Sequence, residues 1–109
     1  MAFKKIEKEI VDKLSNILGE YVIEIILYGS VARNEATEES DIDIAVLVKE
    51  ALDEKTRDEL LSWCAEIDIQ YDCVMSVIDI ENDKFEMWKN THPFYKNVNE
   101  EGVVLWKAA

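Results

Sequence analysis

Residues 27–44 read LYGSVARNEATEESDIDI and connect two apolar segments of the chain. The first segment, Val22 to Tyr28, is rich in β-branched residues and stops at Gly29, which predicts a strand. The second, Asp41 to Val48, alternates acidic and aliphatic residues before becoming wholly apolar, which predicts another strand. The connection from Ser30 to Ser40 is shorter than the dozen or more residues that a parallel crossover usually needs. We therefore expect a small mixed sheet.

Two acidic residues in the second strand are placed to share one face of that sheet. Side chains alternate along a strand, so Asp41 and Asp43 project to the face opposite the aliphatic residues Ile42, Ile44, Val46 and Val48. Their Cα atoms are then roughly 6.5–7 Å apart. Two carboxylates held side by side repel each other unless a cation binds between them. Oxygen ligands of this kind suit Mg²⁺ or Mn²⁺, although a solvated strand face is the competing interpretation.

The turn after the first strand has the composition of a phosphate-binding turn. Gly29 permits a tight turn and a close approach of phosphate to the backbone. Backbone N–H groups after Gly29 and the Ser30 hydroxyl are suitable donors to phosphate oxygens. Arg33 lies about one turn further on and is placed for a charge-assisted contact, or for an ion pair with Glu35, Glu38 or Glu39. Phosphate and metal ligands thus come together at the ends of neighbouring strands.

The remaining sequence completes an α/β (α+β) order, with helices expected on one face of the sheet and the other face partly open. We expect the following further elements: a helix from Phe3 to Leu18 ending at Gly19, a helix over Asp53 to Ile69, a strand over Asp72 to Ile80, a short helix over Lys84 to Lys89, a helix from Pro93 to about Glu101, and an apolar segment from Val103 to Trp106 that either pairs as an edge strand or covers the core. Leu60, Leu61, Cys64 and Ile67 are expected to face the core, with Trp63 a further possibility.

Length and composition restrict the function. The 109 residues predict one domain, 1–109, and 49% hydrophobic residues are sufficient for a packed core. No signal peptide or membrane-spanning segment is evident, so we expect a cytoplasmic protein without a membrane partner. Cys64 and Cys73 form neither a zinc motif nor a disulfide framework, and are expected in the core. The net charge of −12 disfavours direct binding to nucleic acids and favours a basic protein partner or a metal–nucleotide complex.

Taken together, these residues resemble the signature of the DNA polymerase β-like nucleotidyltransferase superfamily. That signature is Gly-Ser, ten residues, then Asp-x-Asp, and Ser30 to Asp41 has this spacing. The form Gly-Ser-x-Ala-Arg followed by Ser-Asp-Ile-Asp is similar to the minimal nucleotidyltransferases (MNT) of bacteria and archaea. The resemblance covers Ile25 to Val48 strongly and the remainder less specifically. It implies the polymerase β-like nucleotidyltransferase fold.

By this resemblance, Asp41 and Asp43 bind two Mg²⁺ ions, and Gly29 and Ser30 bind the triphosphate. A hydroxyl of the acceptor then attacks the α-phosphorus in line and pyrophosphate leaves, with one ion lowering the pKa of the acceptor and the other stabilising the leaving oxygens. Members of the superfamily also have a third carboxylate on a later strand. Asp72 is preferred for this role because it is expected to begin the third strand; Asp68 and Asp79 are alternatives, and a plain turn residue is an equal possibility for Asp72.

The resemblance also implies a partner and a role. Minimal nucleotidyltransferases of this kind typically act as antitoxins with helical HEPN-type proteins, so the expected reaction is transfer of AMP from ATP to a hydroxyl of that partner. The alternative is a non-catalytic module that neutralises the partner by contact alone. Substituting Asp41 and Asp43 by Asn would distinguish the two. The identity of the acceptor, the base preference and the oligomeric state, including a homo-oligomer, stay open, and His92 and the aromatic residues are expected to be structural or part of an interaction surface.

Overall fold

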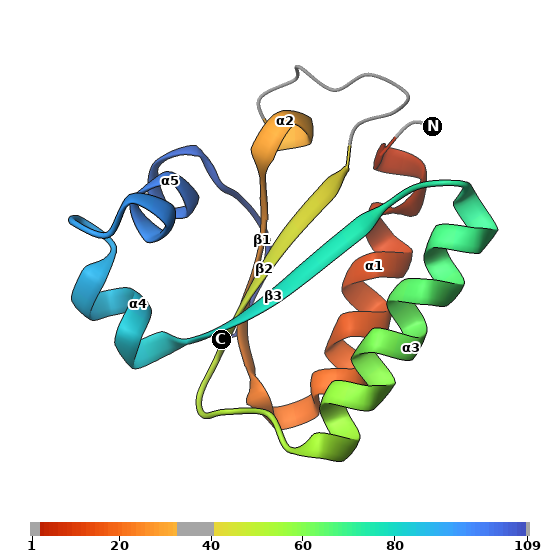
Figure 1. Cartoon of the computed structure of the whole chain (residues 1–109), viewed down its shortest axis with the longest axis horizontal. Coiled ribbons are helices and arrows are strands. Elements are labelled where there is room, and N and C mark those ends of the chain that lie inside the picture. The colour runs from red at the N-terminus through yellow and green to blue at the C-terminus, as the bar shows by residue number, and fades with distance from the viewer. Residues whose placement is uncertain (1–2, 33–40, 109) are drawn as a thin grey trace.

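The computed structural model describes residues 3–32 and 41–108 and contains one four-stranded sheet (Figure 1). Its strands are β1 (Val22–Tyr28), β2 (Ile42–Val48), β3 (Met75–Glu81) and β4 (Val103–Lys107), in the spatial order β3-β2-β1-β4. β1 pairs antiparallel with both β2 and β4, whereas β2 and β3 are parallel. The predicted mixed sheet is therefore confirmed, and the segment at the C-terminal end is an edge strand.

One α-helix precedes the first strand and the others lie between strands. They are α1 (Phe3–Leu18), the 3₁₀ turn η1 (Gly19–Tyr21), α2 (Gly29–Ala32), α3 (Glu54–Tyr71), α4 (Asn82–Trp88) and α5 (Pro93–Glu101). The parallel pair β2 and β3 is connected through α3, as a parallel crossover requires. Asp53 caps the N-terminus of α3, where its Oδ1 accepts a hydrogen bond of 2.7 Å from the Thr56 N–H. Within the described residues no helix is long and apolar enough to span a membrane.

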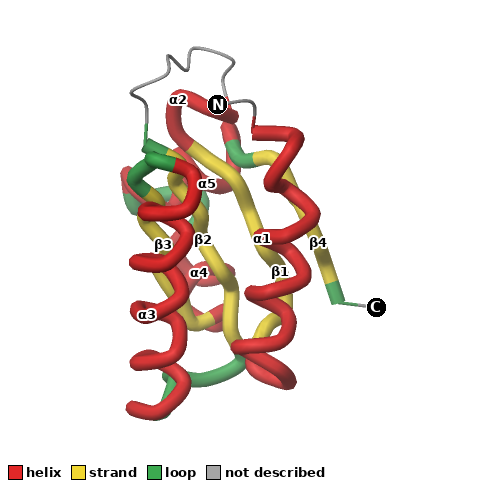
Figure 2. The backbone as a smooth tube through the Cα atoms, turned by 90° about the vertical axis from the view of Figure 1, so that its right-hand side faces the viewer, coloured by secondary structure: helices red, strands yellow, loops and turns green. Residues whose placement is uncertain are grey.

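One face of the sheet, here called the closed face, is covered by α1 and α3 (Figures 1 and 2). In α1, four buried aliphatic residues recur at helical spacing: Ile6, Ile10, Leu14 and Leu18. They pack in the same core cluster as the four aliphatic residues of β2 that were predicted to face inward: Ile42, Ile44, Val46 and Val48. The prediction that these four residues of β2 face the core is therefore confirmed.

The opposite face, here called the open face, is only partly covered. α4 and α5 pack against one end of it through Phe85 and Val98, which join Ile26, Ala45 and Leu47 in a second apolar cluster. Helices thus lie on both faces, and the expectation of helices on one face holds only for α1 and α3. The second helical layer forms because Ala45 and Leu47 are apolar on the open face and are removed from water there.

Two details of the predicted elements are wrong. Leu61 is 61% exposed, whereas Trp63 is buried at 6% exposure, so α3 presents Trp63 to the core instead of Leu61. The third strand begins at Met75, and Asp72 is the C-cap of α3 with a left-handed backbone (φ 50°, ψ 53°). The helix continues to Tyr71 and needs a left-handed residue to end it, so the extended strand starts three residues later than the apolar pattern indicated.

Candidate functional site

The Asp43 carboxylate lies directly against Gly29, at the end of the sheet where β1 ends and β2 begins. The antiparallel register of β1 and β2 pairs Tyr28 with Asp43, which brings the residue after β1 beside this acid. Gly29 has a φ of +76°, and a Cβ added there would collide with Oδ2 of Asp43. Glycine is therefore required at this position for two reasons: the backbone is left-handed, and the Asp43 carboxylate occupies the space that a Cβ would need.

Asp41 is exposed and lies immediately before β2. The next residue, Ile42, donates its N–H to the Val74 carbonyl at 2.8 Å, which fixes the start of β2 against the segment leading into β3. Asp41 and Asp43 thus flank a buried anchor, Ile42, which is 1% exposed. This arrangement holds two carboxylate-bearing residues at one end of the sheet.

Tyr28 forms the side of the site next to Asp43. Its ring contacts Phe94 of α5 edge to face, with ring centroids 5.5 Å apart and an interplanar angle of 89°. Burial and, secondly, the negative charge of Asp43 raise the pKa of the Tyr28 hydroxyl above its ordinary value. Tyr28 therefore stays protonated at neutral pH and places a neutral, partly buried group beside the acid.

The other nucleotide-binding residues expected from the sequence are only partly covered by the structure. Ser30 is the second residue of α2, directly after Gly29, so its backbone follows the turn at the end of β1. Arg33 lies outside the described residues, as do its alternative ion-pair partners Glu35, Glu38 and Glu39. The interpretation of Ser30 and Arg33 as phosphate ligands stays a prediction.

The three acids considered for the third carboxylate lie in different environments. Asp68 accepts a hydrogen bond of 2.8 Å from the Met75 N–H through Oδ1, which ties the end of α3 to the start of β3. Asp79 makes two hydrogen bonds of 3.1 Å with the Arg57 guanidinium and pairs in register with Val46, which places it on the closed face. Asp72 is exposed at the end of α3.

Within residues 3–32 and 41–108, the structure contains no group of three or more acidic, histidine or cysteine side chains that could hold a metal ion. Asp72 is therefore not brought together with Asp41 and Asp43. The residue of β3 in register with Asp43 is instead Ser76, which is exposed. Sequence reasoning missed Ser76 because a serine in an alternating strand carries no signal until the register with β2 is known.

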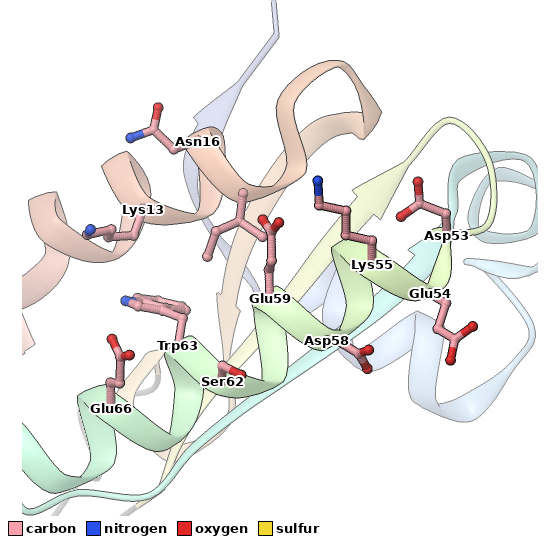
Figure 3. A pocket seen from close by; sticks show the side chains of 11 residues that line it. Lys13, Asn16, Asp53, Glu54, Lys55, Asp58, Glu59, Ser62, Trp63 and Glu66 are labelled. Atoms are coloured by element: carbon pink, nitrogen blue, oxygen red, sulfur yellow. The ribbon is translucent and has the colours of Figure 1, made fainter.

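A groove of about 940 Å³ lies away from these residues, between α1 and α3 on the outer side of the helices that cover the closed face (Figure 3). Its charged lining residues are mostly acidic: Asp53, Glu54, Asp58, Glu59 and Glu66, with Lys13 and Lys55. Neither Gly29 nor Asp43 contributes to it. An acidic groove repels the phosphates of a nucleotide, and the residues predicted to bind the nucleotide and metal do not line it.

The donors at the open face fit a hard divalent cation. Asp41 and Asp43 supply carboxylate oxygens, which are the ligands that Mg²⁺ and Mn²⁺ prefer. Mg²⁺ commonly uses one or two carboxylates and completes its shell with water and substrate phosphates. A metal-bound phosphate beside Gly29 is a suitable substrate arrangement for phosphoryl or nucleotidyl transfer.

Comparison with known proteins gives nucleotidyltransferases both from a family profile and from an individual relative. The sequence profile of the family described as "Polymerase beta, Nucleotidyltransferase" matches residues 9–108. The chain is 34% identical over 103 residues to "Putative protein adenylyltransferase MJ0604" of Methanocaldococcus jannaschii, covering 94% of this chain and 97% of the relative.

Solved structures share the fold. A chain of a toxin–antitoxin structure with AMP-PNP superposes with a TM-score of 0.68 at 25% identity, covering 94% of this chain and 73% of that chain. A structure of the tri-AMPylated Shewanella oneidensis HEPN toxin in complex with MNT antitoxin gives a TM-score of 0.61 at 24% identity, covering 96% of this chain and 72% of that chain.

Proposed function

Because this chain belongs to the polymerase β nucleotidyltransferase family, we propose that it transfers AMP from ATP to a hydroxyl group of a partner protein in an Mg²⁺-dependent reaction. The observation that carries the proposal is the contact between Asp43 and Gly29, which joins the two halves of the Gly-Ser and Asp-x-Asp signature at one end of the sheet. A turn and an acid that are 14 positions apart (43 − 29) become neighbours because β1 and β2 are antiparallel.

Each residue of the signature has a distinct role in this proposal. Asp41 and Asp43 would hold two Mg²⁺ ions, which when bound supply Lewis-acid stabilisation of phosphate oxygens. Gly29 and Ser30 would bind the triphosphate through their N–H groups and the Ser30 hydroxyl, and Arg33 would add a positive charge. Asp43, which lies against Gly29 and is paired in register with Tyr28, would hold a cation beside the α-phosphate, where the acceptor hydroxyl attacks and pyrophosphate leaves.

A protein acceptor is supported by three observations. The curated relative is named as a protein adenylyltransferase, and the solved toxin–antitoxin structures share the fold. The chain has 24 acidic and 12 basic residues, so its surface suits a basic protein better than a polyanion. We propose a helical HEPN-type toxin as the partner, with this chain acting as its antitoxin in the cytoplasm.

The test is calorimetric titration of ATP into the protein with and without Mg²⁺, alongside the Asp41→Asn/Asp43→Asn double variant. The expected result is metal-dependent binding to the wild type that the double variant loses. Asp79→Asn is the matched control, since it removes one carboxylate from the closed face and is expected to leave binding intact. Binding of equal strength to the wild type and to the double variant would exclude a nucleotide site at the open face.

The transfer step is tested with α-labelled ATP and a HEPN-type helical protein as the acceptor. Label on a tyrosine, serine or threonine hydroxyl of that protein, absent with the double variant, is the expected outcome. Neutralisation of the partner by the double variant as complete as by the wild type would favour the contact-only alternative.

A further inference from the structure

Ser76 occupies the position on β3 that is closest in register to Asp43. β2 and β3 are parallel, and the register pairs Asp43 with Ser76, Ala45 with Ile78 and Leu47 with Ile80. Leu47 and Ile80 are buried in the same apolar cluster on the open face, so Ser76, which has the same alternation, shares that face with Asp43. Neighbouring strands are about 4.8 Å apart, which places the residue at position 76 within reach of any ion bound to Asp43.

The nearby acids have other positions or other partners. Asp79 lies on the closed face and pairs with Arg57, while Asp68 accepts the Met75 N–H. Asp72 ends α3 in a left-handed conformation and is not part of a three-residue acidic group. Ser76 is left as the exposed, polar residue of β3 beside Asp43.

We propose that Ser76 stands at the third position of the metal site, so that Asp41 and Asp43 are the only carboxylates that residues 3–32 and 41–108 contribute to it, and divalent cations are delivered together with the triphosphate. This inference rests on the proposed function and concerns how the metal reaches the site. Two carboxylates balance the charge of one divalent ion, and a neutral hydroxyl adds none. The phosphates of ATP then provide the negative charge needed to hold the cations during transfer.

An engineered third acid should let the site bind a divalent ion without the triphosphate. In Ser76→Asp the new carboxylate faces Asp43 across one strand spacing, which strengthens binding of a free divalent ion and increases repulsion when no ion is present. We expect the affinity for Mn²⁺ without nucleotide to rise about 10-fold or more, which corresponds to about 1.4 kcal/mol. The thermal midpoint of Ser76→Asp should fall slightly without metal and recover when Mn²⁺ is added.

The experiment measures free Mn²⁺ by electron paramagnetic resonance during titration of the full chain, first alone and then with AMP-PNP. The variants are Ser76→Asp, Ser76→Ala and, as a control, Thr91→Asp at an exposed position between α4 and α5. Wild type and Ser76→Ala should bind Mn²⁺ weakly and equally, Thr91→Asp should not differ from them, and Ser76→Asp should bind more tightly. Addition of AMP-PNP should tighten binding to the wild type and narrow its difference from Ser76→Asp.

Two results would overturn the inference while leaving the proposed function in place. One is unchanged Mn²⁺ affinity in a folded Ser76→Asp variant, together with ATP binding that still requires Asp41 and Asp43. The other is a loss of Mn²⁺ affinity in Asp72→Asn as large as that in Asp41→Asn, which would make Asp72 the third ligand. If instead the Asp41→Asn/Asp43→Asn variant binds metal and ATP as the wild type does, the proposed function fails and this inference fails with it.

Discussion

The two faces of β2 differ in what surrounds them, although the same seven residues build both. On the closed face, Ile42, Ile44, Val46 and Val48 are at most 1% exposed beneath α1 and α3. On the open face, Ala45 and Leu47 are buried, whereas Asp43 is only half-buried. The comparison shows that one strand supplies stability through one set of positions and the proposed chemistry through the other. The following predictions test that separation.

The largest expected effect is on stability at the closed face. Ile44→Ala should lower the free energy of unfolding by about 2–5 kcal/mol, because Ile44 is fully buried and its truncation leaves a cavity. Asp43→Asn, at the adjacent position, should change it by less than about 1 kcal/mol while abolishing metal-dependent ATP binding. Urea unfolding monitored by tryptophan fluorescence measures the free energy of unfolding of both variants. If Asp43→Asn lowers this free energy as much as Ile44→Ala does, Asp43 is needed for stability.

The second prediction concerns the thiols packed against the closed-face core. Burial, with a smaller contribution from the charge of Asp68, raises the pKa of Cys64 to about 11, from 9.0 for an unperturbed thiol. At pH 9 the native protein should therefore react with iodoacetamide at Cys64 roughly 10–50 times more slowly than the protein unfolded in urea. Because the folded pKa is the higher one, this thiol favours the folded state below pH 9, and that contribution declines as the pH rises towards 11. Equal alkylation rates in the two states would show that the site is open to water.

The third prediction concerns the contact between Gly29 and Asp43 at the open face. Gly29→Ala should lower stability by about 1–2 kcal/mol for the left-handed backbone, with a further loss because the new Cβ displaces the Asp43 carboxylate. Gly19→Ala is the matched control, since Gly19 also has a positive φ (+53°) and no atom lies within 4 Å of an added Cβ.

A double-variant cycle isolates that contact. In an Asp43→Ala background, Gly29→Ala should destabilise the protein no more than Gly19→Ala does. If the additional loss at position 29 persists in that background, the carboxylate is not its cause.

The smallest effect is expected from the ion pair on the closed face. Asp79→Asn removes the negative charge and one of the two oxygens that accept the 3.1 Å hydrogen bonds from Arg57, whose side chain is 47% exposed. Exposed pairs of this kind contribute little to stability, and Asp79 lies on the face opposite Asp43, so ATP affinity should stay unchanged. A measurable fall in affinity for the Mg²⁺–ATP complex would show that Asp79, on the closed face, affects binding at the open face.

Much of the fold could be predicted from local patterns. The spacing of Ile6, Ile10, Leu14 and Leu18 determines α1, and Gly19 ends it with a positive φ. The short connection between β1 and β2 predicts the antiparallel pair that the structure has, and the family resemblance is confirmed by the family profile. These features follow from residues close together in the sequence, where helical and strand periodicity act directly.

The position of the third site residue depended on the tertiary structure. The apolar run before Ile80 does not reveal that α3 continues to Tyr71, that Asp72 is its left-handed cap, or that Ser76 pairs with Asp43. Register between β2 and β3 is fixed by packing of α3 and by long-range hydrogen bonds such as Ile42 N–H to the Val74 carbonyl. A one-residue change in register moves every side chain to the other face, so the sequence alone determined which acids were available and only the folded sheet decided which residues lie beside them.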